Sequence, residues 1–291
     1  MKPFFGIRAH DYGTRPAEEL AAHIATSGAK CVQLALAKAL PGDRLLPSDF
    51  GDDGIAAVRK AFNDNGLSIA VIGCYIDTVD LNLEAREFSL KRFEAHIASA
   101  AALGCRIIGT ETGSPIPYLD KPDGKETAFR VALKSLHRLV KAAEVKGIYV
   151  GVEPVDEFHA LSSIEHVKIM IEEFNSPALG IIFDPVNLVP STGIADMDVF
   201  LDECFAAFGN QILAIHAKDF NMIPSENGLV KSGPLPAGSG DMDWEGLFTR
   251  LIKAGKQDVP ILLEEAGPAD APAAFARLQV EWDKALQSFN R

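Results

Sequence analysis

Eight short apolar runs recur along this 291-residue chain, and a longer amphipathic segment follows each one. Strongly apolar strands are typical of a parallel sheet that helices cover on both faces. Eight strand–helix units in about 250–290 residues match the size of a closed (β/α)8 barrel. We therefore predict an α/β fold, a (β/α)8 TIM barrel, with residues 1–291 as a single domain because no Pro/Gly/Ser-rich linker divides the chain. The predicted strands are 4–9, 31–37, 68–74, 105–111, 148–154, 179–185, 212–218 and 260–266.

The segments between the runs carry the start and stop signals of helices. One begins with Pro16 in its first turn, where proline is favoured. Two pairs have the spacing of capping boxes, which satisfy the first free N–H groups of a helix: Asp123 with Glu126, and Ser162 with Glu165. Four predicted helices end at a glycine, the usual C-terminal stop: Gly28, Gly66, Gly104 and Gly147. Three more helical patterns cover 196–208, 243–254 and 271–289.

An open doubly wound sheet is the alternative fold, and its fingerprint would be G-x-G-x-x-G directly after the first strand. The chain has GIRAHDYG there, at 6–13, which does not match. The only G-x-G, at 238–240, lies in a Pro/Gly-rich segment at 233–241 and not on a strand-to-helix turn. It is weak support for phosphate binding, and we expect a loop that folds over the barrel mouth.

The formal net charge is −12, which argues against a nucleic-acid partner, because phosphate backbones need a basic surface. Arg8 and His10 interrupt the apolar N-terminal stretch, which argues against a signal peptide. No run of about eighteen apolar residues occurs, so we expect no membrane span. The four cysteines form no C-x-x-C pair, so we expect reduced thiols in a cytoplasmic protein: Cys31, Cys74, Cys105 and Cys204.

Polar side chains end most of the predicted strands, and a barrel has its active site at the C-terminal ends of its strands. The sharpest pattern falls on four successive strands, which end in Glu153, Asp184, His216 and Glu264. Neighbouring strands lie about 5 Å apart, so we expect these side chains to converge. A divalent cation would remove the repulsion among three carboxylates and offset the cost of burying them. Three oxygen donors and an imidazole favour Mn²⁺, with Mg²⁺, Co²⁺ and Zn²⁺ as the other candidates.

Each of these residues also has a structural interpretation. Asp184 alone could cap a helix or stand in a solvated loop, and His216, between two apolar residues, could be a hydrogen-bonded core histidine. Four such coincidences on consecutive strands are much rarer than one metal site, so we favour the metal site.

Further polar residues fall at or after the other strand ends. His10 follows the first strand, Glu111 ends the fourth and His159 follows the fifth, and we expect these three to line the mouth and bind substrate. The second strand carries Gln33 and Lys38, and the third reaches Tyr75 and Asp77. The remaining histidines lie within helical patterns and are predicted to be surface or packing residues: His23, His96, His137 and His166.

Two residues near the end of the seventh strand have two interpretations each. Lys218 either holds a substrate hydroxyl and stabilises negative charge, or forms an ion pair with Asp219 or another carboxylate. Trp244 either packs against the apolar face of a sugar or, the interpretation we favour, anchors the start of a helix.

Five short motifs occur in this order on the last four predicted strands and before the helix at 243–254: GVEPV (151–155), FDPVN (183–187), HAKDF (216–220), AGSGDMDW (237–244) and LLEE (262–265). Together they resemble the xylose-isomerase-like barrels of the sugar phosphate isomerase/epimerase group. The resemblance covers nearly the whole chain. It implies that Glu153, Asp184, His216 and Glu264 bind the metal ion and that Glu153 and Glu264 also act as acid and base.

The same resemblance bears on the substrate. Asn187 falls where ketose 3-epimerases of that group usually have a substrate-binding histidine, and we expect Asn187 to bind substrate here. Those epimerases also tend to have an arginine shortly after the metal-binding histidine, whereas Lys218 and Asp219 follow His216 in this chain. The H-x-K-D pattern is closer to the inositol-catabolism and general isomerase branches. On the last strand, alternation sends Glu264 and Glu265 to opposite sides, and the motif favours Glu264 as the ligand, with Glu265 capping or facing a helix.

The sequence therefore predicts a divalent-metal-dependent isomerase or epimerase that transfers protons in a sugar or polyhydroxy ketone through an enediolate. The alternatives are a dehydratase of an inosose-like keto-polyol, a non-catalytic sugar-binding barrel, and a DNA-repair enzyme of the abasic-site endonuclease type. The few histidines at the predicted mouth and the acidic charge disfavour the last. A homo-oligomer is compatible with the sequence.

Overall fold

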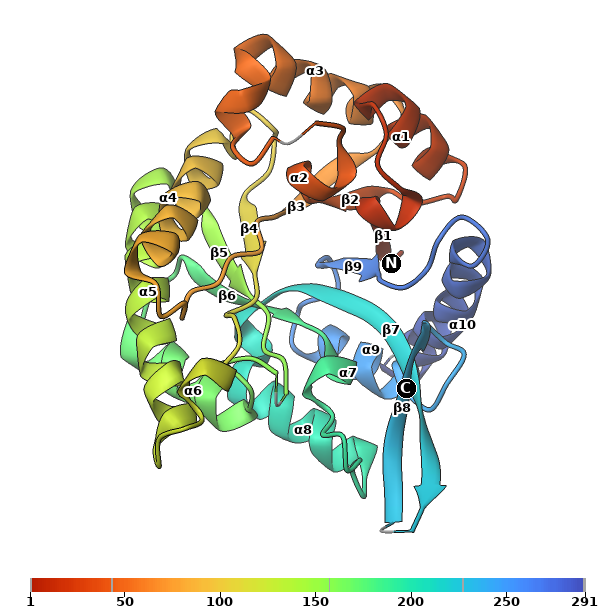
Figure 1. Cartoon of the computed structure of the whole chain (residues 1–291). Helices are drawn as coiled ribbons and strands as arrows, with labels where there is room; N and C mark the ends of the chain where they lie inside the picture. The colour runs from red at the N-terminus through yellow and green to blue at the C-terminus, as the bar shows by residue number, and fades with distance from the viewer. Residues whose placement is uncertain (1, 43, 157, 227, 290–291) are drawn as a thin grey trace.

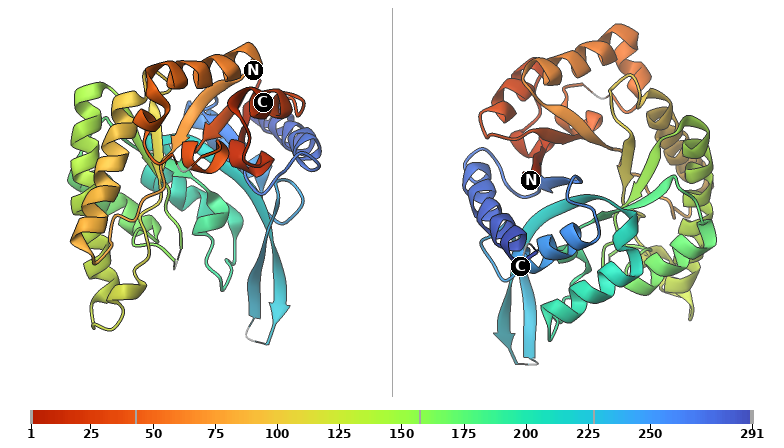
Figure 2. Two further views of the ribbon diagram at one scale, coloured as in Figure 1. Left: turned by 45° about the horizontal axis from the view of Figure 1, so that its top comes forward. Right: turned by 180° about the vertical axis from the view of Figure 1, so that it is seen from behind.

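The computed structural model describes residues 2–289 except 43, 157 and 227, and it confirms the closed parallel barrel (Figure 1). Each strand of the ring pairs with its neighbours, and the ring closes where the last strand pairs with the first and with β7 (Figure 2). All eight predicted strands are present: β1 (Phe4–Arg8), β2 (Cys31–Leu34), β3 (Ser68–Gly73), β4 (Ile107–Thr110), β5 (Tyr149–Val152), β6 (Leu179–Phe183), β7 (Ile212–Ser225) and β9 (Pro260–Leu263).

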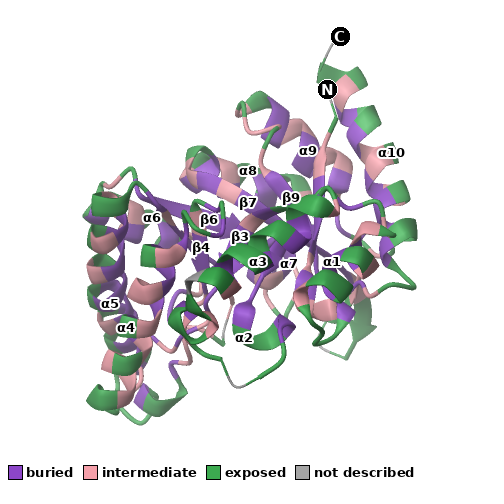
Figure 3. Cartoon of the chain, turned by 90° about the horizontal axis from the view of Figure 1, so that it is seen from above, coloured by how far each residue is buried: buried purple, intermediate pink, exposed green. Residues whose placement is uncertain are grey.

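Helices surround this ring, and Figure 3 shows the strands largely buried while the helices carry both buried and exposed residues. The long helices are α1 (Ala17–Ala25), α3 (Gly51–Asp64), α4 (Leu83–Ser99), α5 (Gly124–Lys146), α6 (Ile164–Phe174), α8 (Met197–Phe208), α9 (Trp244–Lys253) and α10 (Ala271–Phe289). Shorter helices lie in the loops: α2 (Leu36–Ala39), α7 (Pro185–Leu188), η1 (Ala9–Tyr12), η2 (Pro47–Phe50), η3 (Ile116–Tyr118) and η4 (Gly209–Gln211).

The barrel interior is filled by side chains and is not a channel. Ile182 on β6 is buried there with Val71, and two glycines on β4 and β5 leave room for it. A Cβ atom at Gly109 would lie 2.6 Å from Ile182, and one at Gly151 would lie 2.9 Å from it. Any larger residue at these positions would clash with the packed interior, which is as dense as an organic crystal.

Both predicted capping boxes are wrong. Asp123 precedes α5, but its side chain makes no capping hydrogen bond. Its backbone angles, φ −109° and ψ 33°, depart from the extended conformation that a capping residue usually adopts. Glu126 pairs with Arg130 instead. Before α6 the capping residue is Ser163, one position later than predicted, and its Oγ accepts the backbone N–H of His166 at 3.1 Å.

The segment predicted as a loop at 233–241 is partly a strand. β7 continues beyond the ring to Ser225 and pairs with the antiparallel β8 (Gly228–Pro236), forming a hairpin that projects from the barrel (Figure 2). The following residues pack against β7 and α10. A Cβ atom at Gly240 would lie 2.1 Å from the Phe220 carbonyl oxygen, and one at Gly238 would lie 2.8 Å from Arg277. Close packing therefore explains the G-x-G pattern.

All four cysteines are buried and free of disulfides. Within the described ranges, no helix has the length and apolarity needed to cross a membrane.

Candidate metal centre

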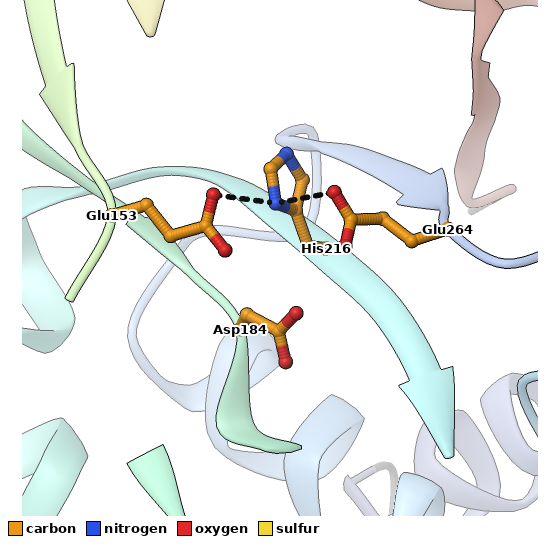
Figure 4. Close-up of side chains that lie close together, drawn as sticks. All are labelled: Glu153, Asp184, His216 and Glu264. Carbon is orange, nitrogen blue, oxygen red and sulfur yellow. Dashed lines mark ion pairs between the residues drawn. The ribbon is translucent and has the colours of Figure 1, made fainter. Parts of the chain in front are cut away.

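Four strand ends bring Glu153, Asp184, His216 and Glu264 together at the C-terminal mouth of the barrel (Figure 4). Glu153 directly follows β5, Asp184 follows β6, His216 lies within β7, and Glu264 follows β9. One ligand atom from each residue lies within 4.8 Å of all the others. Every member of this cluster is at most 3% exposed, so the charges are shielded from solvent.

Three carboxylates surround the single imidazole. His216 Nδ1 lies 3.1 Å from Glu153 Oε2 and 3.1 Å from Glu264 Oε1. Lys218, two residues along β7, places its Nζ 2.8 Å from Asp184 Oδ2 and 3.1 Å from Glu264 Oε2. Lys218 is therefore paired with two carboxylates of the cluster and not with Asp219.

The pKa values show how strongly these groups depend on each other. Burial raises the pKa of Asp184, and Lys218 opposes that rise. Burial also raises the pKa of Glu264, but His216, Lys218 and Arg8 lower it more, to about 2. Burial lowers the pKa of His216, whereas Glu153 and Glu264 raise it more, to about 9. Positive charge among the carboxylates is thus stabilising, whether a proton or a cation supplies it.

The orientation of His216 leaves one ring nitrogen for a cation. Its Nε2 lies 2.8 Å from Gln33 Oε1, and Gln33 Nε2 donates to the hydroxyl of Tyr75. Because the Gln33 amide donates to Tyr75, its oxygen accepts the N–H of His216, which assigns a proton to Nε2 and leaves Nδ1 as the nitrogen that can exchange its proton for a cation. His216 Nδ1 is buried and faces the carboxylate oxygens of Glu153 and Glu264.

The cluster fits a divalent cation on these grounds. A lone pair that faces two carboxylate oxygens at 3.1 Å is repelled unless a cation or a proton lies between them. Three carboxylates and one imidazole are donors that Mn²⁺, Mg²⁺ and related ions accept. Asp184 also caps α7, because its Oδ1 accepts the backbone N–H of Asn187 at 3.0 Å, so it serves as helix cap and candidate ligand at once.

The predicted substrate-binding residues differ in whether they contact the cluster. Asn187 contacts the cluster directly, since its Nδ2 donates to Glu153 Oε1 at 2.7 Å. Glu111 and His159 face each other, with Oε2 and Nε2 3.5 Å apart. His10 stands edge-on to the Tyr75 ring, with ring centroids 6.4 Å apart. Burial, together with the positive charges of Arg8 and Lys38, lowers the pKa of His10 to about 3.

The alternatives for Trp244 and Glu265 are also settled by contacts. Trp244 is buried at the start of α9 and donates its Nε1–H to Asp219 Oδ2 at 3.1 Å, as expected of an anchor. Glu264 points into the cluster, whereas Glu265 is exposed and pairs with Arg8 instead of a helix. The four histidines of the helical patterns lie outside the cluster, and three of them pack against aromatic rings: His23, His137 and His166.

Sequence reasoning missed Arg8 and assigned no role to Gln33 or Tyr75. Arg8 Nη1 lies 3.1 Å from Glu264 Oε1, and its Nη2 lies 2.9 Å from Glu265 Oε1. All three residues stand at or next to the C-terminal ends of β1, β2 and β3, so the strand-end rule that found the cluster also pointed to them. Their partners, however, were not apparent from the sequence.

A model of the xylose isomerase-like TIM barrel family matches residues 21–285, so the chain belongs to that family. The chain is 25% identical to a 3-oxo-isoapionate decarboxylase from Pectobacterium atrosepticum over 209 residues, which are 71% of this chain and 69% of that protein.

Two solved structures show the same fold. A 3-keto-D-glucoside 4-epimerase from E. coli is 18% identical, with a TM-score of 0.71 over 96% of this chain and 100% of that one. A xylose isomerase-like TIM barrel protein from Mycobacterium smegmatis, solved in complex with magnesium, is 16% identical, with a TM-score of 0.72 over 98% and 94% of the chains.

Proposed function

We propose that this protein is a divalent-metal-dependent enzyme that moves a proton at a carbon next to the carbonyl of a sugar or related polyhydroxy ketone. The observation that carries the proposal is the cluster itself: three buried carboxylates and one imidazole nitrogen within 4.8 Å of one another, at the end of the barrel where such enzymes act. The names of two similar proteins support it, since one describes a 3-oxo compound and the other a 3-keto sugar.

Glu153, Asp184, His216 and Glu264 would hold the cation. When bound, a divalent cation draws electron density from the substrate oxygens and stabilises the negative charge of an enediolate. The donor set is rich in oxygen, which favours Mn²⁺ or Mg²⁺.

The chain supplies the proton-transfer groups. Glu153 and Glu264 approach His216 from opposite sides (Figure 4), so they can serve opposite faces of a substrate that lies between them. Asn187 holds one oxygen of Glu153 and leaves the other facing the centre of the cluster. A carboxylate placed in this way can take a proton from carbon and return it, which is general acid–base catalysis.

Lys218 is placed to stabilise charge that develops on substrate oxygens. It is only 8% exposed, and its ammonium group lies between Asp184 and Glu264. Burial lowers the pKa of Lys218, but these two carboxylates raise it more, so it remains a cation and a hydrogen-bond donor.

The number and placement of the bases decide the reaction. Two opposed bases favour epimerisation, one base acting on two carbons gives isomerisation, and elimination of a β-hydroxyl gives dehydration.

The test is a metal analysis followed by a screen for deuterium uptake from solvent, using ketoses, aldoses, inosose-like ketones and 3-oxo sugar acids. Replacing Glu153→Gln should lower the exchange rate at least about a hundredfold, because it removes the base and leaves the shape of the side chain. The matched control is Glu265→Gln on the exposed neighbour of Glu264, which should keep the exchange rate. Full exchange by the Glu153→Gln variant would exclude Glu153 as the acid/base group.

The remaining alternatives give different results in the same screen. A non-catalytic barrel would bind metal and sugar without deuterium uptake. A dehydratase would release water from a keto-polyol, and a decarboxylase would release CO₂ from a 3-oxo acid. A DNA-repair enzyme is disfavoured by the single histidine in the cluster and the net charge of −12.

A further inference from the structure

A small cavity of about 80 Å³ is lined by residues that follow β2, by the C-terminal end of β3 and by helix α4. Lys38 on α2, Tyr75 after β3 and Arg92 on α4 form its polar wall. Ala35 and Gly73 also line it and contribute no long side chains.

The two cations of this cavity differ from the other basic residues near the mouth. Arg8 and Lys218 are each paired with carboxylates at 2.8–3.1 Å. In the part of the chain that the structure describes, neither Lys38 nor Arg92 has such an ion pair; Lys38 Nζ lies over the Tyr75 ring, and Arg92 Nη2 donates to the Tyr75 carbonyl oxygen. Lys38 is exposed and Arg92 is half-buried, so the cavity presents two cations without carboxylate partners in a chain with a net charge of −12.

Arg92 also has an unsatisfied donor. Its Nε atom is buried and has no hydrogen-bond partner among the described residues. An unpaired buried N–H of a charged group is costly, and an anion is the partner that satisfies it best. His96, on the same cavity wall, does not add charge, because burial lowers its pKa.

Two side chains, Tyr75 and Gln33, link the cavity to His216 of the cluster. Lys38 Nζ lies 4.1 Å from the centroid of the Tyr75 ring, and the hydroxyl of that ring accepts from Gln33, the partner of His216. Lys38 also acts on residues of the mouth: its positive charge helps to lower the pKa of His10 and opposes the rise that burial causes in the pKa of Glu111. The Lys38 ammonium group therefore lies against Tyr75, close enough to influence charged groups of the mouth.

We propose that Lys38 and Arg92 bind an anionic group of the substrate, a carboxylate or a phosphate, while the reacting carbons lie at the metal cluster. The proposal rests on the proposed function and narrows its substrate class to acidic or phosphorylated sugar derivatives. Lys38 supplies a point charge at the mouth, and Arg92 supplies the planar N–H donors deeper in the cavity.

Three polyols that differ at one end test this without catalysis: sorbitol, D-gluconate, which has a carboxylate, and sorbitol 6-phosphate. Calorimetric titration of each into the metal-loaded protein should give about tenfold tighter binding of at least one anion than of sorbitol, as expected for a charge-assisted hydrogen bond. The anion that binds more tightly identifies carboxylate or phosphate as the preferred group.

Lysine variants on either side of β2 distinguish anion binding in the cavity from a general effect of positive charge on the protein. Lys38→Met should abolish the preference for the anion, and Lys38→Arg should retain it. Lys30→Met removes the same charge just before β2, where the Lys30 side chain is exposed, and should leave the preference unchanged. Circular dichroism of each variant checks that the barrel is folded.

Several results would overturn the proposal. These are equal affinities for the three polyols, no detectable binding of either anion, or a preference that persists in Lys38→Met, which would mean that the anion binds the metal directly. If the proposed function is wrong but this proposal is right, calorimetry will show an anion preference that depends on Lys38, while no substrate will exchange deuterium with solvent.

Discussion

Two buried aspartates on neighbouring strands, Asp184 after β6 and Asp219 on β7, have opposite surroundings although both are fully shielded from solvent. Asp184 accepts the backbone N–H of Asn187 and otherwise faces Lys218 and the other carboxylates of the cluster. Asp219 lies at the base of the β7–β8 hairpin and accepts N–H groups at 2.8–3.1 Å from four donors: Phe220, Gly238, Met242 and the indole of Trp244.

This difference distinguishes a structural carboxylate from a candidate ligand. A carboxylate that accepts several N–H groups has its charge satisfied by the protein and joins the segments that supply the donors. Carboxylates that are grouped together repel one another, and a bound cation relieves that repulsion. Both carboxylates are equally buried, but their partners differ. The same substitution by asparagine should therefore weaken metal binding at Asp184 and lower the stability of the fold at Asp219.

The largest effect is expected for Asp184→Asn on metal binding. Removing one negative ligand should weaken Mn²⁺ binding on the order of a thousandfold, about 4 kcal/mol, because the remaining donors carry less charge. The stability of the metal-free protein should change by less than about 1 kcal/mol, since the asparagine oxygen can still cap α7 and Lys218 keeps Glu264 as a partner. Calorimetric titration with Mn²⁺ and thermal unfolding with and without a chelator measure the two quantities.

Asp219→Asn should give the reverse pattern and the second largest effect. The new amide can accept fewer N–H groups and turns its own NH₂ towards donors, so unfolding should become easier by about 3 kcal/mol. That loss should lower the melting temperature by about 6 °C, while the variant still binds Mn²⁺ when folded. If Asp219→Asn lost metal affinity without losing stability, the distinction between the two aspartates would fail.

A smaller effect is expected from Gln33→Leu, which tests whether the first half of the barrel orients the ligands of the second. Without its acceptor, His216 loses the hydrogen bond that directs Nδ1 to the cluster, and Mn²⁺ affinity should fall about tenfold. Gln279→Leu on α10 is the matched control, because the Gln279 amide donates to the exposed Asp283 at 2.9 Å and lies outside the cluster. Unchanged Mn²⁺ affinity in Gln33→Leu would show that other contacts suffice to orient His216.

The cluster was predictable because three of its members directly follow a strongly apolar strand and His216 follows the apolar residues 212–215. Glu153, Asp184 and Glu264 each follow a strand directly, and a charged residue at such a place needs a reason to be there. The supporting contacts were not predictable in the same way. Gln33 and His216 are 183 residues apart, and Arg8 and Glu265 are 257 apart, so no local pattern relates them.

Local signals were also less reliable than the barrel repeat. The Asp123 and Ser162 capping boxes had the right spacing but failed, because the backbone at each helix start decided which side chain could reach an N–H group. The hairpin was missed because its second strand contains Gly233, Pro234 and Pro236, residues that weaken a strand signal.

The sequence by itself determined the barrel and the order of the four candidate ligands, because strand periodicity and strand-end position are properties of neighbouring residues along the chain. Only the tertiary structure decided which side chains support those ligands, which of two adjacent glutamates enters the cluster, and which buried aspartate is satisfied by the protein alone. These outcomes depend on distances and directions between strands far apart in sequence, and closing the ring is what brings their side chains into contact.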